Sequence, residues 1–326
     1  MVYNHEMLSF CAEIGTNRLL VQGAGGNASW KENNTLWIKA SGMWLVDAKS
    51  HNIFLPIDLG QLRENLARND FEVKPLNLSE SNLRPSIETF LHVLMPWKFV
   101  LHTHSVNILT ILVRKNALKE IKDIMKNRND WVFIDYFKPG SNLARAVHSE
   151  LYKNPLAHIV FMKNHGLVIG AETVQELSVR LQEIENFFYN EIKYNYVLPK
   201  NSPEIEGYSI VDKPEVQALV KHDRLFKRIK EDWVLYPDHV IFLDAVAKTN
   251  IKEKPLNLFL KDVAVYQKNE ITRAAKAQLL CYADVMIRQG YNDQLTSLSD
   301  YEINQLINWD AEKYRKKLND SERKSK

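Results

Sequence analysis

Short apolar runs alternate with amphipathic stretches along the first 200 residues. Apolar residues recur at helical spacing from Met7 to Leu19 and predict a helix over residues 4–21. Strands are expected at residues 35–39, 99–103, 131–134, 159–162 and 167–170, and further helices at residues 57–69, 87–94, 106–114, 142–152 and 173–196. The pattern predicts an α/β fold in which an antiparallel-rich central sheet is flanked by helices.

The pattern changes at residues 198–214, which hold three prolines and a glycine and are typical of a linker. We therefore predict a catalytic domain over residues 1–200 and a smaller α+β extension over residues 201–326. Within the extension, strands are expected at residues 240–243 and 263–266, and helices at residues 272–288 and 301–318.

Composition excludes several protein classes. The 326 residues are 45% hydrophobic and 25% charged, as in ordinary globular proteins, and the net charge of +3 is too small to indicate a nucleic-acid partner. Cys11 and Cys281 are far apart in sequence and do not resemble a disulfide framework, which fits a reducing compartment. The N-terminus lacks the order of a signal peptide, and no apolar run reaches the roughly 18 residues of a membrane span. We expect a cytoplasmic protein without a membrane or nucleic-acid partner.

Three histidines carry most of the candidate chemistry. His102 and His104 are two residues apart at the end of an apolar run, and alternate residues of a strand point to the same face. His165 lies between two apolar runs, at the expected turn of a hairpin, and Glu88 precedes the histidine pair. Three imidazoles with one carboxylate are the ligand set of a catalytic zinc site.

Five motifs together resemble the class II aldolase/adducin family over about residues 5–195. They are GGNAS at Gly25–Ser29, ASG at Ala40–Gly42, PSIE at Pro85–Glu88, HTH at His102–His104 and NHG at Asn164–Gly166. This family includes zinc-dependent fuculose-phosphate and rhamnulose-phosphate aldolases and ribulose-phosphate 4-epimerase. The segment YPDHV at Tyr236–Val240 resembles the aldolase portion of bifunctional rhamnulose-phosphate aldolase/dehydrogenases. No dinucleotide-binding G-x-G-x-x-G motif follows, so no NAD binding is expected.

The resemblance implies one Zn²⁺ per chain, bound by His102, His104 and His165, which stabilises the negative charge of an enediolate during aldol cleavage. It implies that Glu88 is the catalytic acid/base. An aspartate stands at this position in the epimerases, so the glutamate favours an aldolase. Tyr136 matches a tyrosine that donates a proton to the aldehyde oxygen from a neighbouring subunit, which implies a homo-oligomer, expected to be a tetramer with active sites near subunit interfaces.

The resemblance also implies a phosphate pocket built from three turns. The matching positions are Asn27, Ser41, Gly42 and Ser86. Ile87 departs from the pattern, because the phosphate aldolases often carry a second serine there. Lys39 could compensate, although it could also face solvent from its strand.

We therefore expect a zinc-dependent lyase of carbohydrate metabolism that reversibly cleaves a ketose, by expectation a ketose 1-phosphate, into dihydroxyacetone phosphate and an aldehyde. Two alternatives stay open. One is a pentulose-phosphate 4-epimerase with the same metal. The other is an adducin-like interaction module without catalysis. His92 follows Glu88 by one helical turn and could support the site residues, but we expect it to be a packed structural histidine, as we do His239.

Overall fold

The structure is a computed structural model that describes residues 4–195, 199 and 202–321. The first part of the chain contains a seven-stranded sheet in the order β3-β2-β1-β4-β7-β6-β5. Its strands are β1 (Asn27–Glu32), β2 (Thr35–Lys39), β3 (Phe54–Asp58), β4 (Phe99–Thr103), β5 (Trp131–Ile134), β6 (Ile159–Met162) and β7 (Gly166–Ala171). Every neighbouring pair is antiparallel except β5–β6, so the prediction of an antiparallel-rich sheet is confirmed.

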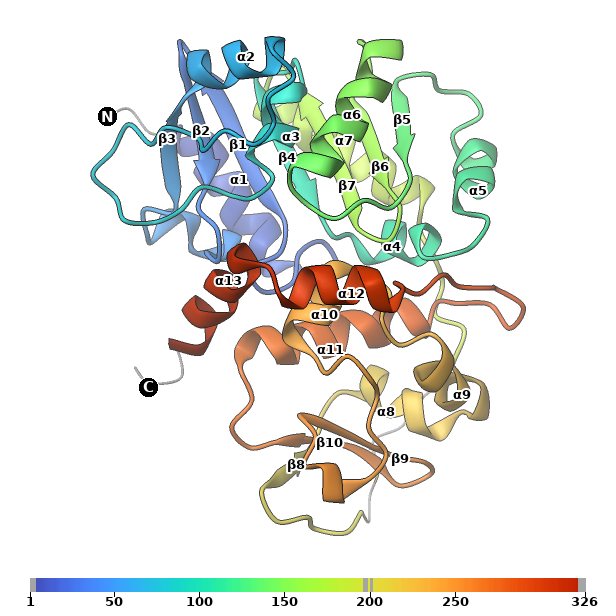
Figure 1. Cartoon of the computed structure of the whole chain (residues 1–326). Coiled ribbons are helices and arrows are strands. Elements are labelled where there is room, and N and C mark those ends of the chain that lie inside the picture. Colours follow the sequence, from blue (N-terminus) through green and yellow to red (C-terminus); the bar gives the residue numbers. More distant parts are fainter. Residues whose placement is uncertain (1–3, 196–198, 200–201, 322–326) are drawn as a thin grey trace.

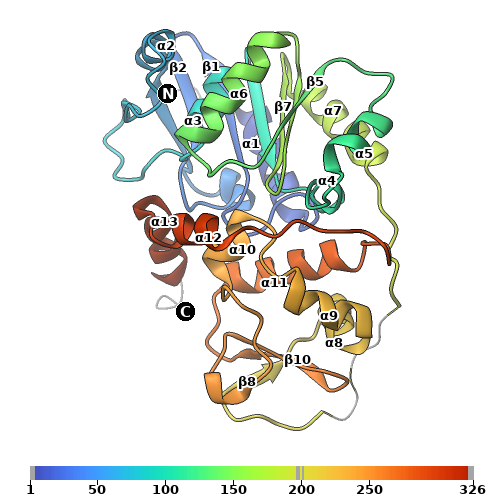
Figure 2. The same cartoon turned by 45° about the vertical axis from the view of Figure 1, so that its right-hand side comes forward.

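Helices cover both faces of this sheet (Figures 1 and 2). They are α1 (His5–Thr16), α2 (Leu59–Ala67), α3 (Thr89–Leu94), α4 (Val106–Leu112), α5 (Ala117–Ile124), α6 (Ser141–Lys153) and α7 (Val174–Phe187), with a 3₁₀ turn, η1 (Leu45–Lys49). Alternate residues of β4 belong to two cores: Phe99 and Leu101 pack with α1, α4 and α7, whereas Val100 packs with α2, α3 and α6. Both faces of the central strand are therefore buried.

The second part of the chain lies along one end of the large sheet, with α12 and α13 running between that sheet and the rest (Figures 1 and 2). It has a three-stranded sheet in the order β8-β10-β9, from β8 (Tyr208–Ile210), β9 (Asn257–Leu260) and β10 (Ala264–Lys268). Its helices are α8 (Pro214–Lys221), α9 (Asp223–Glu231), α10 (Pro237–Phe242), η2 (Ile251–Glu253), α11 (Arg273–Met286), α12 (Asp300–Ile307) and α13 (Asp310–Ser321).

One hydrophobic core joins the two parts. It contains Leu109 of α4 together with Leu279 and Met286 of α11, all fully buried. The type of sheet changes near residue 200, but hydrophobic packing continues across that boundary. The division into domains at 1–200 and 201–326 stays a prediction.

Several expected elements differ in the structure. Ile57 and Asp58 belong to β3, and the helix begins at Leu59. The expected strand 240–243 is wrong: residues 240–242 belong to α10, which begins with proline at its first position, where the missing N–H costs no hydrogen bond. The helix expected at 173–196 ends at Phe187, and the one expected at 301–318 is two helices. Residue 196 and linker residues 198, 200 and 201 lie outside the described residues.

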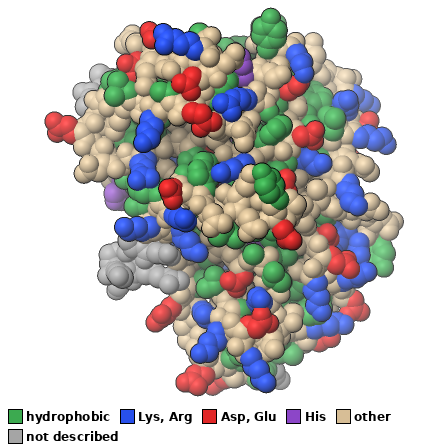
Figure 3. Space-filling model, viewed as in Figure 1, with side chains coloured by type: hydrophobic (Ala, Val, Ile, Leu, Met, Phe, Trp, Pro, Cys, Tyr) green, Lys and Arg blue, Asp and Glu red, His purple; other side chains and the backbone are tan. Residues whose placement is uncertain are grey.

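None of the helices in the described ranges has the length and apolar content needed to cross a membrane. On the face seen in Figure 3, acidic and basic side chains are interspersed. Cys11 and Cys281 are both buried and free, as expected from their separation.

Candidate metal centre

Two neighbouring strands bring the candidate ligands to one end of the large sheet. His102 in β4 lies directly opposite Asn27 of β1 and Val168 of β7. His104 follows immediately after the end of β4, and His165 lies in the turn immediately before β7. Histidines that are far apart in sequence therefore meet because β4 and β7 are adjacent.

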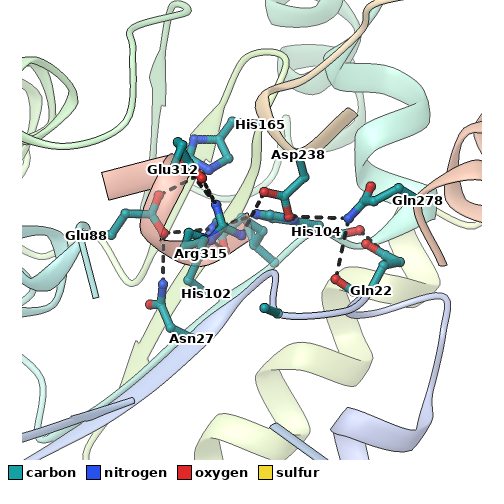
Figure 4. Close-up of polar contacts among 12 residues, drawn as sticks. Gln22, Asn27, Glu88, His102, His104, His165, Asp238, Gln278, Glu312 and Arg315 are labelled. Carbon is teal, nitrogen blue, oxygen red and sulfur yellow. Dashed lines mark hydrogen bonds and ion pairs between the residues drawn. The ribbon is translucent and has the colours of Figure 1, made fainter. Parts of the chain in front are cut away.

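The three imidazoles converge (Figure 4). Their candidate ligand atoms all lie within 4.8 Å of one another, and Nε2 of His102 is 3.0 Å from Nε2 of His104. All three side chains are buried, with exposed fractions of 0%, 6% and 5% for His102, His104 and His165. The sequence predicted that these three histidines share one site, and the structure brings them together.

Hydrogen bonding determines which ring nitrogens can bind a metal. Nδ1 of His102 lies 2.9 Å from the carbonyl oxygen of Leu167, which can only accept, so this nitrogen donates. Nδ1 of His104 lies 3.3 Å from Oδ2 of Asp238, again an acceptor. Both Nε2 atoms then present lone pairs to each other with no hydrogen between them, an arrangement that a cation would stabilise. Two nitrogens on one tetrahedral zinc are roughly 3.3 Å apart, close to the separation seen here.

Glu88 faces the same point. Its Oε1 is 3.1 Å from Nε2 of His165, and its Oε2 is 3.5 Å from Nε2 of His102. Asn27 donates through Nδ2 to Oε2 at 2.8 Å, which orients the carboxylate. The expected helix at 87–94 begins at Thr89, so Glu88 is the N-cap residue of α3 rather than part of the helix.

The protonation states suit metal binding. Burial raises the pKa of Glu88, but the facing imidazoles of His102 and His165 outweigh this effect and hold that pKa well below its usual range. Burial lowers the pKa of His102 to about 3, against the opposing effect of Glu88. Near neutral pH the site therefore contains a carboxylate facing a neutral imidazole of His102, and these are the forms that bind metals.

His92 is a packed histidine, as expected, and it also orients Asn27. It is fully buried, and its Nδ1 is 2.7 Å from Oγ of Ser29. Its Nε2 contacts Oδ1 of Asn27, which leaves the Asn27 amide nitrogen to donate to Glu88. A chain of contacts thus runs from Ser29 to the candidate acid/base.

A small cavity adjoins the ligands, with a volume of about 30 Å³. All four residues predicted to bind phosphate line it, as do Ile87 and two of the histidines. The lining residues are Ala24, Gly26, Asn27, Lys39, Ser41, Gly42, Ser86, Ile87, Glu88, His104, Pro139, His165, Pro237, Asp238, Glu312 and Arg315. The structure therefore brings the candidate metal, acid/base and anion-binding residues together.

Lys39 does not face solvent, the alternative considered from sequence. Its side chain is 2% exposed, and Nζ donates to the carbonyl oxygens of Met43 at 2.6 Å and Ala24 at 3.2 Å. Burial, followed by the neighbouring charge of Arg315, lowers its pKa to about 7. Near neutral pH, Lys39 at the cavity wall is therefore protonated in only part of the molecules.

The second part of the chain supplies three buried charged residues that sequence reasoning missed. Asp238 of α10 contacts His104, and Arg315 of α13 lies 2.9 Å from Oδ1 of Asp238. Arg315 also lies 2.9 Å from Oε2 of Glu312 on the same helix. The YPDHV motif contains Asp238 and was a usable signal, whereas nothing local marks Arg315 in the charged C-terminal stretch.

Tyr136 does not line the cavity. Its hydroxyl is buried without a hydrogen-bond partner among the described residues, and burial together with Glu302 of α12 raises its pKa. Within one chain, the structure does not bring Tyr136 to the other candidate catalytic residues.

Part of this chain is similar to known proteins. The chain is 32% identical over 204 residues to the uncharacterized oxidoreductase YuxG of Bacillus subtilis (strain 168), a match that covers 56% of this chain and 29% of that protein. The chain thus spans less than a third of the length of that curated relative.

Similar solved structures include the N-terminal class II aldolase domain of a conserved protein from Thermoplasma acidophilum. That match has 25% identity and a TM-score of 0.47, and covers 58% of this chain and 96% of that one. A sugar-phosphate aldolase from Thermotoga maritima matches with 16% identity and a TM-score of 0.43, covering 56% of this chain and 93% of that one.

The sequence profile of one family, described as the Class II Aldolase and Adducin N-terminal domain, matches residues 5–192. This range contains all three converging histidines, Glu88 and the four predicted anion-binding residues. The chain belongs to the class II aldolase and adducin family.

Proposed function

We propose that this protein is a metal-dependent lyase that reversibly cleaves a ketose, or a ketose 1-phosphate, into dihydroxyacetone phosphate and an aldehyde. The observation that supports this most strongly is the convergence of three buried imidazoles on Glu88 beside a polar cavity. Zn²⁺ is the metal proposed, one per chain, because nitrogen ligands and an open coordination position suit its catalytic sites.

His102, His104 and His165 would hold the metal. When bound, the ion supplies Lewis-acid stabilisation of the negative charge that develops on the ketone fragment. Imidazole binds a metal as an uncharged ligand. Three histidine ligands would therefore leave the positive charge of the ion available to the substrate. Asp238 and the Leu167 carbonyl hold two of the rings in orientation through their Nδ1 atoms.

Glu88 would move the proton. In the direction of aldol addition, its carboxylate removes a proton from the carbon of the ketone fragment that forms the new bond. In the direction of cleavage, the hydroxyl group of the aldehyde fragment gives up its proton, the carbon–carbon bond breaks, and the electron pair of that bond goes to the ketone fragment. Glu88 takes up the released proton and delivers it to the carbon of the ketone fragment. Asn27 holds Oε2, and Oε1 has no other hydrogen-bond partner within the described residues, so one oxygen is available for the transfer.

The cavity wall would bind the anionic end of the substrate. Ser41 and Ser86 supply uncharged hydroxyl donors, and Lys39 supplies a cation. Asn27 also lines the cavity, but its amide nitrogen already donates to Glu88 and Ser86, so it would bind the substrate only by releasing one of them. With every carboxylate ionised, Glu88, Asp238 and Glu312 outnumber Lys39 and Arg315 by one charge. A divalent cation reverses that sign, so an anionic substrate fits the metal-bound pocket better than the metal-free one.

Substrate entry would require movement of α13. A cavity of about 30 Å³ holds about one water, whereas ligand pockets are roughly 300–1,000 Å³. Glu312 and Arg315 of α13 close one side of the cavity. Displacing this helix opens the pocket without disturbing the strands that carry the histidines.

We also propose that Tyr136 donates a proton to the aldehyde oxygen in the active site of a neighbouring subunit of a homo-oligomer. In one chain the Tyr136 hydroxyl is buried beside α12, so a role in a neighbouring active site requires that segment to shift on assembly. The expected assembly is a cytoplasmic homotetramer with sites near its interfaces. Loss of aldehyde protonation on Tyr136→Phe, with metal content unchanged, is the result that would support this role.

The function is tested with Glu88→Gln, which keeps the side-chain volume. We expect metal content to stay unchanged and exchange of the ketone fragment's carbon-bound proton with deuterated water to be lost. Glu64→Gln, an exposed residue of α2, is the matched control and should exchange as the wild type does. Unchanged exchange in Glu88→Gln would refute the acid/base assignment.

Product analysis on a panel of ketose phosphates separates the candidate reactions. Release of an aldehyde supports the lyase. An isomer formed without free aldehyde would indicate the 4-epimerase instead. No turnover by a protein that has bound no metal would move the interaction-module alternative to first place.

A further inference from the structure

Asp238 makes the contact through which the second part of the chain reaches the metal centre. It is the second residue of α10 and is 2% exposed. Its Oδ2 lies 3.3 Å from Nδ1 of His104, and its Oδ1 lies 2.9 Å from a guanidinium nitrogen of Arg315. In Figure 4 the Asp238 carboxylate lies between the side chains of His104 and Arg315, and Gln278 lies on the side away from Arg315.

The two carboxylate oxygens have different partners, and this determines the tautomer of His104. An ionised carboxylate only accepts hydrogen bonds, so Nδ1 of His104 must carry the hydrogen that it shares with Oδ2. The lone pair then resides on Nε2, the nitrogen that points at His102. Among the described residues, His165 has no such partner, since its Nδ1 is buried without a hydrogen bond.

The backbone leaves room for this contact only because residue 25 is glycine. A Cβ at this position would lie 2.5 Å from Oδ2 of Asp238 and 2.9 Å from Nδ1 of His104. The same Cβ would lie 2.9 Å from the backbone carbonyl oxygen of Gln22. Real Cβ atoms essentially never approach other atoms so closely, so any larger residue at position 25 must displace these groups. Gly25 belongs to the same GGNAS motif that supplies Asn27.

We propose that Asp238 is a positioning residue for the metal: it holds His104 in the tautomer and orientation that direct Nε2 into the site. The inference rests on the proposed function, because it concerns the metal of that site. This role of Asp238 means that residues after 200 help to assemble the metal centre. The part of the chain outside the matched family range thereby completes the metal site.

The substitution Asp238→Asn gives a directional test. Arg315 can only donate, so it keeps the oxygen of the introduced amide on its own side and turns the amide nitrogen toward His104. That nitrogen donates to Nδ1 of His104, which moves the ring hydrogen to Nε2, the nitrogen needed for the metal. We expect the tautomer of His104 to change and metal affinity to fall by about 10–100-fold.

Two measurements follow these changes without turnover. Nitrogen-15 spectra of labelled histidine in the metal-free protein report the tautomer, with the His104 signal identified by its loss in His104→Gln. Competition titration with Co²⁺, monitored by visible absorption, reports affinity and coordination geometry. Asp212→Asn, at an exposed aspartate in the same part of the chain, is the matched control and should bind Co²⁺ as the wild type does.

A merely structural role is excluded with Arg315→Gln, which removes the link to α13 and leaves Asp238 beside His104. We expect this variant to lose thermal stability but to keep the wild-type His104 tautomer and to bind Co²⁺ more tightly than Asp238→Asn. If the two variants weaken binding equally, Asp238 acts only by fastening α13 and the proposal is overturned.

The proposal is also overturned if Asp238→Asn changes neither the affinity for Co²⁺ nor the tautomer of His104. Failure of wild-type protein to bind Co²⁺ would instead refute the proposed function, so the two failures are distinguishable.

Discussion

Asn27 lies directly opposite His102 in the antiparallel pair β1–β4, and its amide holds Glu88 at 2.8 Å. The register of two strands therefore places the candidate acid/base beside a candidate metal ligand. A slip of one residue would turn Asn27 to the other face of the sheet and release the carboxylate. The hydrophobic packing that fixes this register, with Ala28, Trp30 and Leu101 fully buried, thus also sets the geometry of the site.

Removal of one imidazole should remove the metal. We expect about one zinc per chain in protein purified without a histidine tag or chelator, measured by elemental analysis, and little or none in His104→Ala. His51→Ala, at an exposed histidine outside the cavity, is the control and should retain the metal. Full metal content in His104→Ala would contradict the assignment of this ligand.

Lys39 should make stability depend on pH. Burial lowers its pKa from 10.5 to about 7, so between these values the unfolded chain binds more protons than the folded one. The contribution of Lys39 to the free energy of unfolding is most favourable above pH 10.5 and is lost as pH falls toward 7. Each pKa unit corresponds to about 1.4 kcal/mol, which makes several kcal/mol the upper limit.

Denaturant unfolding of the metal-free protein measures this effect. The free energy of unfolding of the wild type relative to Lys39→Met should rise between about pH 7 and pH 10. Lys49→Met, at an exposed lysine, is the control and should follow the wild type across this range. Parallel curves for wild type and Lys39→Met would show that the fold does not lower the pKa of Lys39.

Gly25→Ala should damage the metal centre through sterics alone. The added methyl group meets Asp238 and His104 at 2.5 and 2.9 Å, so we expect a loss of about 1–3 kcal/mol in unfolding free energy together with weaker metal binding. Gly207→Ala is the comparison, because its φ of +78° adds backbone strain with nothing within 4 Å. It should lower stability and leave metal affinity unchanged, as determined by calorimetric titration.

Asn164 should link the turn of His165 to the second part of the chain. Its side chain donates to the carbonyl oxygens of Leu235 at 2.8 Å and Thr296 at 2.7 Å, and its φ is +52°. Asn164→Gly keeps the left-handed backbone but loses both bonds, and we expect it to cost about 2–3 kcal/mol. Asn164→Ala should cost about 1 kcal/mol more, since alanine disfavours that conformation.

Equilibrium unfolding of both variants checks this ordering. Asn69→Gly is the control, because Asn69 is exposed and has a φ of +56°. It should be nearly neutral. Equal stability of wild type and Asn164→Gly would show that the two bonds do not hold the parts together.

Local pattern predicted most strands of the large sheet, but it assigned residues 57 and 58 of β3 to a helix. The apolar run before His102 formed β4 with the expected bounds, because it is a central strand buried on both faces. The same reasoning failed for residues 240–243, since a short apolar run buried all round has no periodicity that separates strand from helix. The proline at position 237 was the better signal.

Long-range contacts explain what the sequence did not reveal about the site. Arg315 reaches Asp238 across 77 positions, and neither residue has a local partner pattern that predicts the contact. Lys39 lay on a predicted strand, but its burial depends on the carbonyl oxygens of Ala24 and Met43 in flanking turns. Such contacts arise from the packing of whole elements, which periodicity does not describe.

The order of residues along the chain has a consequence for biosynthesis. Glu88 and the three histidines all precede residue 166, whereas Arg315 is translated 150 residues after His165. At about 5–20 residues per second, roughly 8–30 s separate the ligands from the helix that covers them. A nascent chain whose sheet has folded would therefore present the candidate metal site uncovered before α13 is translated. If the proposed ion binds at that stage, the later helix would enclose it.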